Sequence, residues 1–119
     1  KLNGDNNFAD CELAWASFKT SVRKFDFRWA GMLQQNMKDK ERRIHPTQKP
    51  KDLYRWILKN YANTGDKILD THLGSGSSRI AADKAKLIFT ASELDPTYYA
   101  NQEKRFIRKT LPSSNAKAS

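Results

Sequence analysis

The sequence lacks the features that secreted, disulfide-stabilised and membrane-spanning proteins need. Cys11 is the single cysteine among 119 residues, so no intrachain disulfide can form. No histidine lies near it in the sequence, and we expect a buried structural thiol rather than a nucleophile. No apolar run is long enough to cross a bilayer, and no basic-then-apolar signal segment opens the chain. These absences predict a cytoplasmic protein with no membrane partner.

Acidic residues are scarce relative to basic ones. Asp and Glu number 13 against 22 Lys and Arg, which gives a net charge of +9. Such a surplus favours a polyanionic partner, because cations placed at phosphates release counterions, although simple solubility is the alternative. The stretch 37–43 is highly charged, and we interpret it as a solvated connection. Its candidate contacts to nucleic acid are Lys38, Lys40, Arg42 and Arg43.

Two short runs rich in aromatic residues lie within the first thirty positions. Residues 11–18 and 22–29 have the short, alternating character of strands. In the second run Phe25, Phe27 and Trp29 fall on one side, so we expect them to pack together on one face of a sheet. Apolar residues make up 38% of the chain, which is enough for one small folded domain.

The pattern from Pro50 onward is that of an alternating α/β unit. The expected elements are a helix from Pro50, a turn at 63–66, a buried strand over 67–71, a helix over 77–84, a strand over 87–92 and a helix over 95–109. We expect Tyr99, Phe106 and Ile107 on the inner face of the last helix and a frayed tail over 111–119. This order of elements is that of one nucleotide-binding half of a Rossmann-like sheet.

Three polar segments stand at the ends of these elements. The loop Asp70 to Gly76 follows a strand, and its glycines let a ligand approach the backbone and the next helix N-terminus. Glu93 ends the next strand, where such folds place a carboxylate on ribose hydroxyls. Each feature alone also fits an ordinary turn or a solvated acid, but their spacing favours a nucleoside site. The third segment, His45 to Pro50 (HPTQKP), fits a stiff helix cap on composition alone.

His45–Pro50 (HPTQKP) and Ile68–Ser77 (ILDTHLGSGS), at this separation, closely resemble the β-group of DNA amino-methyltransferases. These are adenine-N6 or cytosine-N4 enzymes of restriction-modification and phage origin, whose catalytic motif precedes the cofactor region. The resemblance covers about residues 4–107. It implies a partial Rossmann-like α/β fold of S-adenosylmethionine-dependent methyltransferases, with S-adenosyl-L-methionine as cofactor and DNA as partner. It also implies a bacterial or phage-infected cell as the setting, and it favours adenine as the acceptor.

The resemblance implies roles for individual residues. Thr47 and Lys49 would anchor the methionine carboxylate, helped by the start of the helix after Pro50. Glu93 would accept the ribose hydroxyls, and Leu94 would lie near the adenine. The full set implied for cofactor binding is Thr47, Lys49, Asp70, His72, Gly74, Ser75, Gly76, Glu93 and Leu94. We expect His72 to pack at the loop rather than act as a base, and we expect no metal site.

The sequence has no motif that would hold a target base. Family members use an Asp or Asn side chain, a Pro–Pro pair and an aromatic ring to bind the flipped-out base. No two of the four prolines here are adjacent. We therefore assign no catalytic residue, and expect either the cofactor-binding part of a longer enzyme or a standalone relative without activity. The expected parts are a remnant of the catalytic and target-recognition side over 1–43, a cofactor-binding unit over 44–110 and a flexible tail over 111–119.

Two other interpretations compete with this one. A non-enzymatic nucleic-acid-binding protein derived from a methyltransferase would use the same basic residues and the exposed aromatic ones. A dehydrogenase-like enzyme is set aside, because Arg79 stands where a G-x-G-x-x-G loop needs its third glycine. The incomplete sheet also predicts that a second copy of the chain, or a complementing catalytic segment, covers an open edge or face.

Overall fold

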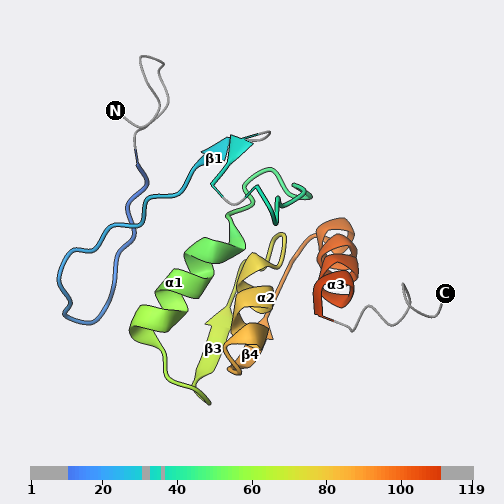
Figure 1. Ribbon diagram of the computed structural model, residues 1–119. Coiled ribbons are helices and arrows are strands. Elements are labelled where there is room, and N and C mark those ends of the chain that lie inside the picture. The colour runs from blue at the N-terminus through green and yellow to red at the C-terminus, as the bar shows by residue number, and fades with distance from the viewer. Residues whose placement is uncertain (1–10, 31–32, 36, 111–119) are drawn as a thin grey trace.

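The computed structural model describes residues 11–30, 33–35 and 37–110 (Figure 1). In chain order the elements are β1 (Trp29–Ala30), β2 (Leu33–Gln34), α1 (Lys51–Tyr61), β3 (Lys67–Asp70), α2 (Ser77–Lys84), β4 (Ile88–Ala91) and α3 (Pro96–Thr110). β1 and β2 pair antiparallel, and β3 and β4 pair parallel. The predicted frayed tail, 111–119, lies outside the described residues. No helix within the described ranges is both long enough and apolar enough to span a bilayer.

The unit from α1 to α3 follows the sequence prediction closely. Pro50 takes the cap position of α1 instead of the first helical position, and Gly65 turns the chain afterwards with a φ of 90°. α2 has the predicted bounds. α3 begins at Pro96, and the Asp95 carboxylate accepts two backbone N–H groups of its first turn, at 2.8 and 3.0 Å. Local capping and turn chemistry therefore set these boundaries.

α2 lies at the centre of the unit, between α1 and α3 and beside the β3–β4 pair (Figure 1). The parallel register runs from Lys67 opposite Ile88 to Asp70 opposite Ala91, so both strands end at the same edge. The buried apolar side chains of the described residues are Leu73, Ile80, Ala81 and Ala82. This small core sits at and just before α2, and it therefore fixes the loop that leads into that helix.

One face of the β3–β4 pair is open to solvent. Leu69 is 68% exposed and Ile88 is 54% exposed, whereas Ile68 and Phe89, which point the other way, are half-buried. The prediction of a buried strand over 67–71 is therefore wrong for half of its side chains. The physical reason is that the helices in the described part of the chain pack on a single face of the pair.

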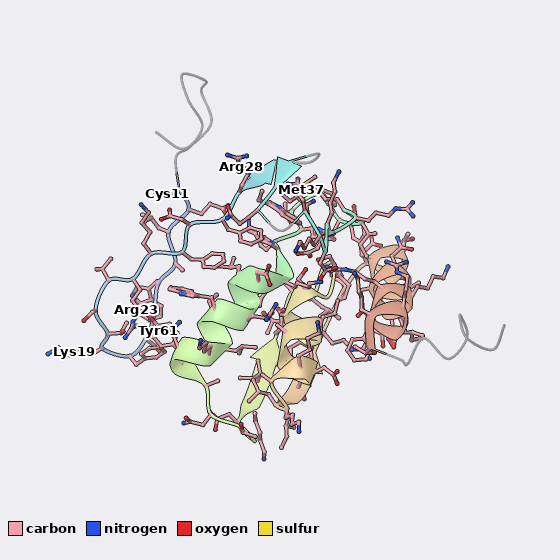
Figure 2. The ribbon with its side chains drawn as sticks, in the orientation of Figure 1. Cys11, Lys19, Arg23, Arg28, Met37 and Tyr61 are labelled. Carbon is pink, nitrogen blue, oxygen red and sulfur yellow. The ribbon has the colours of Figure 1, made fainter. Side chains whose placement is uncertain are left out.

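The strands predicted over 11–18 and 22–29 do not form, apart from Trp29 in β1. The segment before β1 passes along α1, turns back near the end of that helix and returns to β1, with Arg23 close to Tyr61 (Figure 2). The ring of Phe25 stacks on Phe27 at 5.5 Å and also contacts Trp56 of α1 at 5.4 Å, between centroids. The aromatic side chains thus pack against a helix and not within a sheet. Cys11 is exposed, so the expectation of a buried thiol is also wrong.

Polar residues fill the buried face of α3. Gln102 and Arg105 are 1% and 2% exposed, whereas Tyr99 and Ile107, predicted for the inner face, are 49% and 48% exposed. The predicted solvated connection over 37–43 is likewise wrong at Glu41, which is buried. These errors share one cause, because Arg105 and Glu41 form a buried ion pair with 2.7 Å between nitrogen and oxygen.

Candidate functional site

The loop after β3, the end of β4 and the segment before α1 meet around one cleft. Because β3 and β4 run parallel, their carboxyl ends lie at the same edge of the sheet, where ligands of open α/β folds bind. The cleft has a volume of about 370 Å³, within the range of small-molecule sites. It is lined by His45, Thr47, Gln48, Lys49, Tyr54, His72, Leu73, Gly74, Ser75, Ser77 and Glu93.

Two glycines give the loop between β3 and α2 its shape. Gly74 and Gly76 have φ angles of 56° and 79°, in the left-handed region that a Cβ disfavours. The Asp70 carboxylate braces the loop by accepting the His72 backbone N–H at 3.0 Å and a hydroxyl from α2. Ser77, the first residue of α2, lines the cleft, so the unpaired N–H groups of a helix N-terminus lie at its wall.

Glu93 connects the end of β4 to this loop. One carboxylate oxygen accepts the Gly74 N–H at 2.7 Å, and the other accepts the Asp95 N–H at 3.0 Å. The hydrogen bonds from the backbones of Asp95 and Gly74 hold the pKa of Glu93 below its ordinary value, so the group is ionised at neutral pH. A carboxylate offers about four acceptor positions. Each oxygen therefore keeps room for one more donor, such as a hydroxyl of a ligand diol.

The segment His45 to Pro50 folds on itself ahead of α1. Gln48 is buried, and its side chain accepts one backbone hydrogen bond at 2.8 Å and donates another at 3.3 Å within the preceding residues. His45 Nδ1 accepts the Thr47 N–H at 3.2 Å, and the His45 ring packs against Tyr98 with 4.3 Å between centroids. A Cβ added at Gly74 would lie 3.6 Å from that ring. The segment is thus packed directly against the glycine loop.

The family model for N6/N4 DNA methylases matches residues 6–104. The chain belongs to this family. Among solved structures, the chain is similar to the crystal structure of the M1.HpyAVI–SAM complex, with a TM-score of 0.50 and 32% identity. That match covers 52% of this chain and 30% of the other, so this chain spans less than a third of that protein. No curated protein matches the chain significantly. The expected partial Rossmann-like methyltransferase fold is confirmed.

Within this member of the DNA methylase family, Lys49 lies in the cleft and already has a carboxylate partner. Its Nζ is 2.9 and 2.8 Å from the two carboxylate oxygens of Glu12, in the segment before β1. Glu12 is 76% exposed and Lys49 is 36% exposed at the side chain. Lys49 is expected to anchor a ligand carboxylate, but it already binds the carboxylate of Glu12. This ion pair is accessible to solvent.

The structure brings most of the predicted cofactor residues together. Those that line the cleft are Thr47, Lys49, His72, Gly74, Ser75 and Glu93. Asp70 and Gly76 stand behind it, where they shape the loop. Leu94 is 98% exposed and does not line the cleft. The assignment of these residues to a cofactor stays a prediction.

Sequence reasoning missed several residues of the cleft wall, among them Tyr54 and Leu73. Tyr54 is four positions after Pro50, so helical spacing places it on the same side as the start of α1. Burial raises the pKa of its hydroxyl, with a smaller contribution from the Asp70 charge. Leu73 belongs to the small core and also lines the cleft.

The predicted basic contacts lie on the surface and do not line the cleft. Lys38, Lys40, Arg42 and Arg43 are all exposed. The Arg43 guanidinium lies 4.8 Å from the Trp29 ring centroid and donates to the Trp29 carbonyl at 3.4 Å. These contacts hold the guanidinium beside β1. The described residues contain no group of three His, Cys, Asp or Glu side chains arranged for a metal ion.

Proposed function

We propose that this chain is the S-adenosylmethionine-binding part of a DNA methyltransferase that modifies the exocyclic amine of adenine. One observation carries the proposal: three segments distant in sequence, His45–Pro50, the glycine loop and Glu93, line a single cleft. A nucleoside with an amino-acid tail needs a diol acceptor, a carboxylate anchor and an apolar surface. Among the residues that line the cleft, Glu93 offers the diol acceptor, Lys49 the carboxylate anchor and Tyr54 the apolar surface.

The residues of the cleft fit the parts of this cofactor. Glu93 would accept the two ribose hydroxyls with the acceptor positions that its backbone hydrogen bonds leave over. Lys49 and Thr47 would bind the methionine carboxylate. The N-terminus of α2 would help in place of the expected start of α1, whose first N–H already donates to Glu41. Leu73 and the ring of Tyr54 would exclude water from the sulfonium. The bound cofactor would supply an electrophilic methyl group, and the protein residues named here bind and orient it.

Calorimetry with S-adenosylmethionine tests the cofactor assignment. Replacing Glu93 by Ala removes both diol acceptors, and charge-assisted hydrogen bonds are each worth about 1.5–3 kcal/mol, so we expect the affinity to fall at least tenfold. Asp83→Ala is the matched control, since it removes one acidic side chain at the exposed end of α2. No heat from the parent chain, or equal affinities for the parent and Glu93→Ala, would remove the assignment.

Methyl transfer to a base amine needs more than this cleft. The base must be held so that its amine lone pair faces the methyl group, and the family does this with adjacent prolines beside an Asp or Asn. The prolines of this chain, Pro46, Pro50, Pro96 and Pro112, are all separated. We therefore propose that the chain alone is inactive and that a complementing catalytic segment or a second copy meets it. The open face at Leu69 and Ile88 is the surface that such a segment would cover.

Non-enzymatic DNA binding is the second candidate, and the net charge of +9 with exposed Arg42 and Arg43 favours it. Neutralising several phosphates gives an affinity that falls steeply with salt. DNA binding with a steep salt slope, unchanged by the cofactor and accompanied by no calorimetric signal with it, would favour this function over the first. Binding that S-adenosylmethionine strengthens would favour the methyltransferase.

A further inference from the structure

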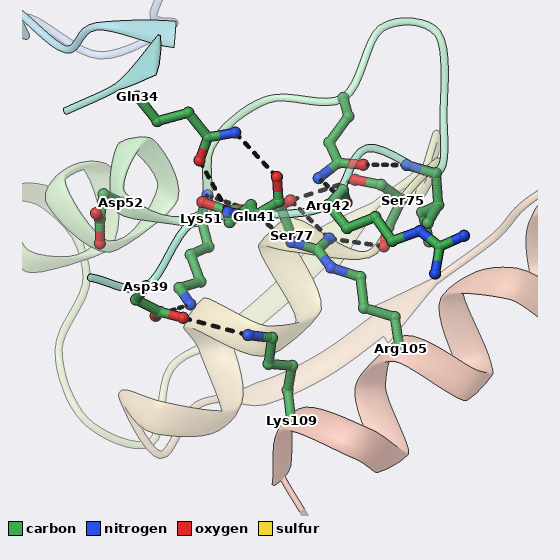
Figure 3. A network of polar contacts seen from close by, with 12 residues as sticks. Gln34, Asp39, Glu41, Arg42, Lys51, Asp52, Ser75, Ser77, Arg105 and Lys109 are labelled. Carbon is green, nitrogen blue, oxygen red and sulfur yellow. Dashed lines mark hydrogen bonds and ion pairs between the residues drawn. The ribbon is translucent and has the colours of Figure 1, made fainter. Parts of the chain in front are cut away.

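Arg105 of α3 is the largest fully buried side chain in the described part of the chain. Its Nη1 donates to the Ser75 carbonyl and to the Ser77 hydroxyl, each at 2.9 Å, and its Nη2 donates to Glu41 Oε1 at 2.7 Å (Figure 3). A guanidinium stays charged when buried and presents its donors in a fixed fork. The fork therefore sets where its three acceptors lie relative to one another.

One of those acceptors, the Ser75 carbonyl, belongs to the glycine loop at the cleft, and another, the Ser77 hydroxyl, belongs to the first residue of α2. The Ser75 carbonyl and the Gly76 N–H share one planar peptide unit. Arg105 holds the oxygen of that unit, and the Leu73 carbonyl accepts its N–H at 3.0 Å. The unit joins Ser75 to Gly76, and the glycine at that end adopts the left-handed region with little steric resistance. Arg105 thus fixes the carbonyl side of a peptide unit whose N–H side is held by Leu73.

The third acceptor ties the same fork to α1. Both oxygens of Glu41 accept the backbone N–H of Lys51, the first residue of α1, at 3.3 and 3.1 Å. Gln34 of β2 clamps the main chain of Glu41 with two hydrogen bonds, at 2.9 and 2.8 Å. These hydrogen bonds hold Glu41 in place beside Arg105, although the two residues are 64 positions apart in the sequence. The ion pair thus connects α3 with the glycine loop and with the start of α1.

Desolvation opposes both charges of the pair. Burial raises the pKa of Glu41 and lowers that of Arg105 from their ordinary values. A buried ion pair of this kind often contributes little net stability, and apolar replacements of both partners are frequently tolerated. We therefore explain this ion pair by the geometry that it imposes on its neighbours, and not by a contribution to the free energy of folding. An outer carboxylate, Asp39, binds Lys51 and Lys109 on the far side of the network (Figure 3).

We propose that Arg105 is a positioning residue, anchored by Glu41, that holds the Ser75–Gly76 peptide in the orientation needed to bind the cofactor. This inference rests on the proposed function, since it concerns the same cleft. Arg105 does not itself line the cleft and acts through the loop. In this role Arg105 contributes to the affinity for the cofactor more than to the stability of the fold. The two quantities can be measured separately.

The test compares the affinity for S-adenosylmethionine with the unfolding temperature in matched variants. The double variant Arg105→Met with Glu41→Leu removes both charges together and leaves no buried ion unpaired. We expect it to melt near the parent and to bind at least tenfold more weakly, because the Ser75 carbonyl loses its charged donor. Arg108→Met, which removes an exposed arginine from the same helix, should change neither quantity.

Amide NMR supplies the readout that a purely structural role would not move. In the double variant the amide signals of Ser75 and Gly76 should shift, while those of β4 stay at their parental positions. Parental affinity in the double variant would overturn the inference alone. A parent chain that does not bind S-adenosylmethionine would overturn the proposed function, and the inference with it.

Arg105→Lys carries the test if the double variant unfolds. It keeps the charge beside Glu41 but replaces the fork by a point charge on a shorter reach. A parental unfolding temperature with at least threefold weaker binding supports the positioning role, since the loss of one ordinary hydrogen bond corresponds to about twofold to tenfold in affinity. Parental affinity with this variant would overturn it.

Discussion

Replacing Gly76 by Ala would place a methyl group where the structure leaves little room for one. The backbone there has a φ of 79°, and a residue with a Cβ pays about 1–2 kcal/mol in this region. The new Cβ would also lie 3.2 Å from both Cβ and Oε1 of Gln102. Gln102 is 1% exposed and is held by Arg79 at 3.1 Å, so it cannot move aside freely. Overpacking of this kind adds about 1–3 kcal/mol, for a total loss of about 2–5 kcal/mol.

Gly65→Ala is the matched control for that loss. Gly65 has a φ of 90°, but nothing lies within 4 Å of its added Cβ, so it carries the conformational cost alone. Thermal unfolding followed by circular dichroism should rank the parent first, Gly65→Ala second and Gly76→Ala last. A difference of about 1 kcal/mol between the two variants corresponds to about 4 °C in a domain of this size. Equal unfolding temperatures for the two variants would refute the packing argument at Gly76.

Two further predictions concern exposed charges. A side-chain hydrogen bond from Lys51, with a smaller one from Lys109, holds the pKa of Asp39 at about 2. Its stabilisation is therefore present above its unfolded value and is lost as the pH falls towards about 2. Asp39→Asn should cost about 1 kcal/mol at pH 7 after allowance for its exposure, and urea titrations should show this difference shrink below pH 4. A difference that is constant with pH would contradict the assignment. Glu12→Gln should release Lys49 and tighten S-adenosylmethionine binding by up to about fivefold in calorimetry, since exposed pairs are worth about 0.2–1 kcal/mol. Unchanged or weaker binding would show that Glu12 does not compete.

Local chemistry made the α/β unit predictable from the sequence. Proline caps, the Gly65 turn and the glycine loop mark where its helices and strands begin and end, and α2 has the expected bounds. The three polar segments meet at one cleft because parallel strands end at a common edge. Local pattern therefore carried both the fold class and most of the candidate site.

Contacts between residues distant in the sequence explain the parts of the fold that the sequence did not predict. The alternation of Phe25 and Phe27 suits a strand or an extended segment on a helix equally well, and Trp56 of α1 decided for the second. Hydrophobic periodicity assigned Tyr99 and Ile107 to the inner face of α3, because a buried arginine has no periodic signature. Arg105 is buried only because Glu41 and the Ser75 carbonyl, far away in the sequence, satisfy its donors.

The open face of the β3–β4 pair has a consequence for how the stability of this chain must be measured. Leu69 and Ile88 stay in water in the folded chain, so folding alone leaves part of the hydrophobic driving force unused. Any molecule that binds this face of the folded chain, and not the unfolded one, raises the unfolding temperature by mass action. The melting point then depends on concentration, and it becomes an indicator of what covers Leu69 and Ile88.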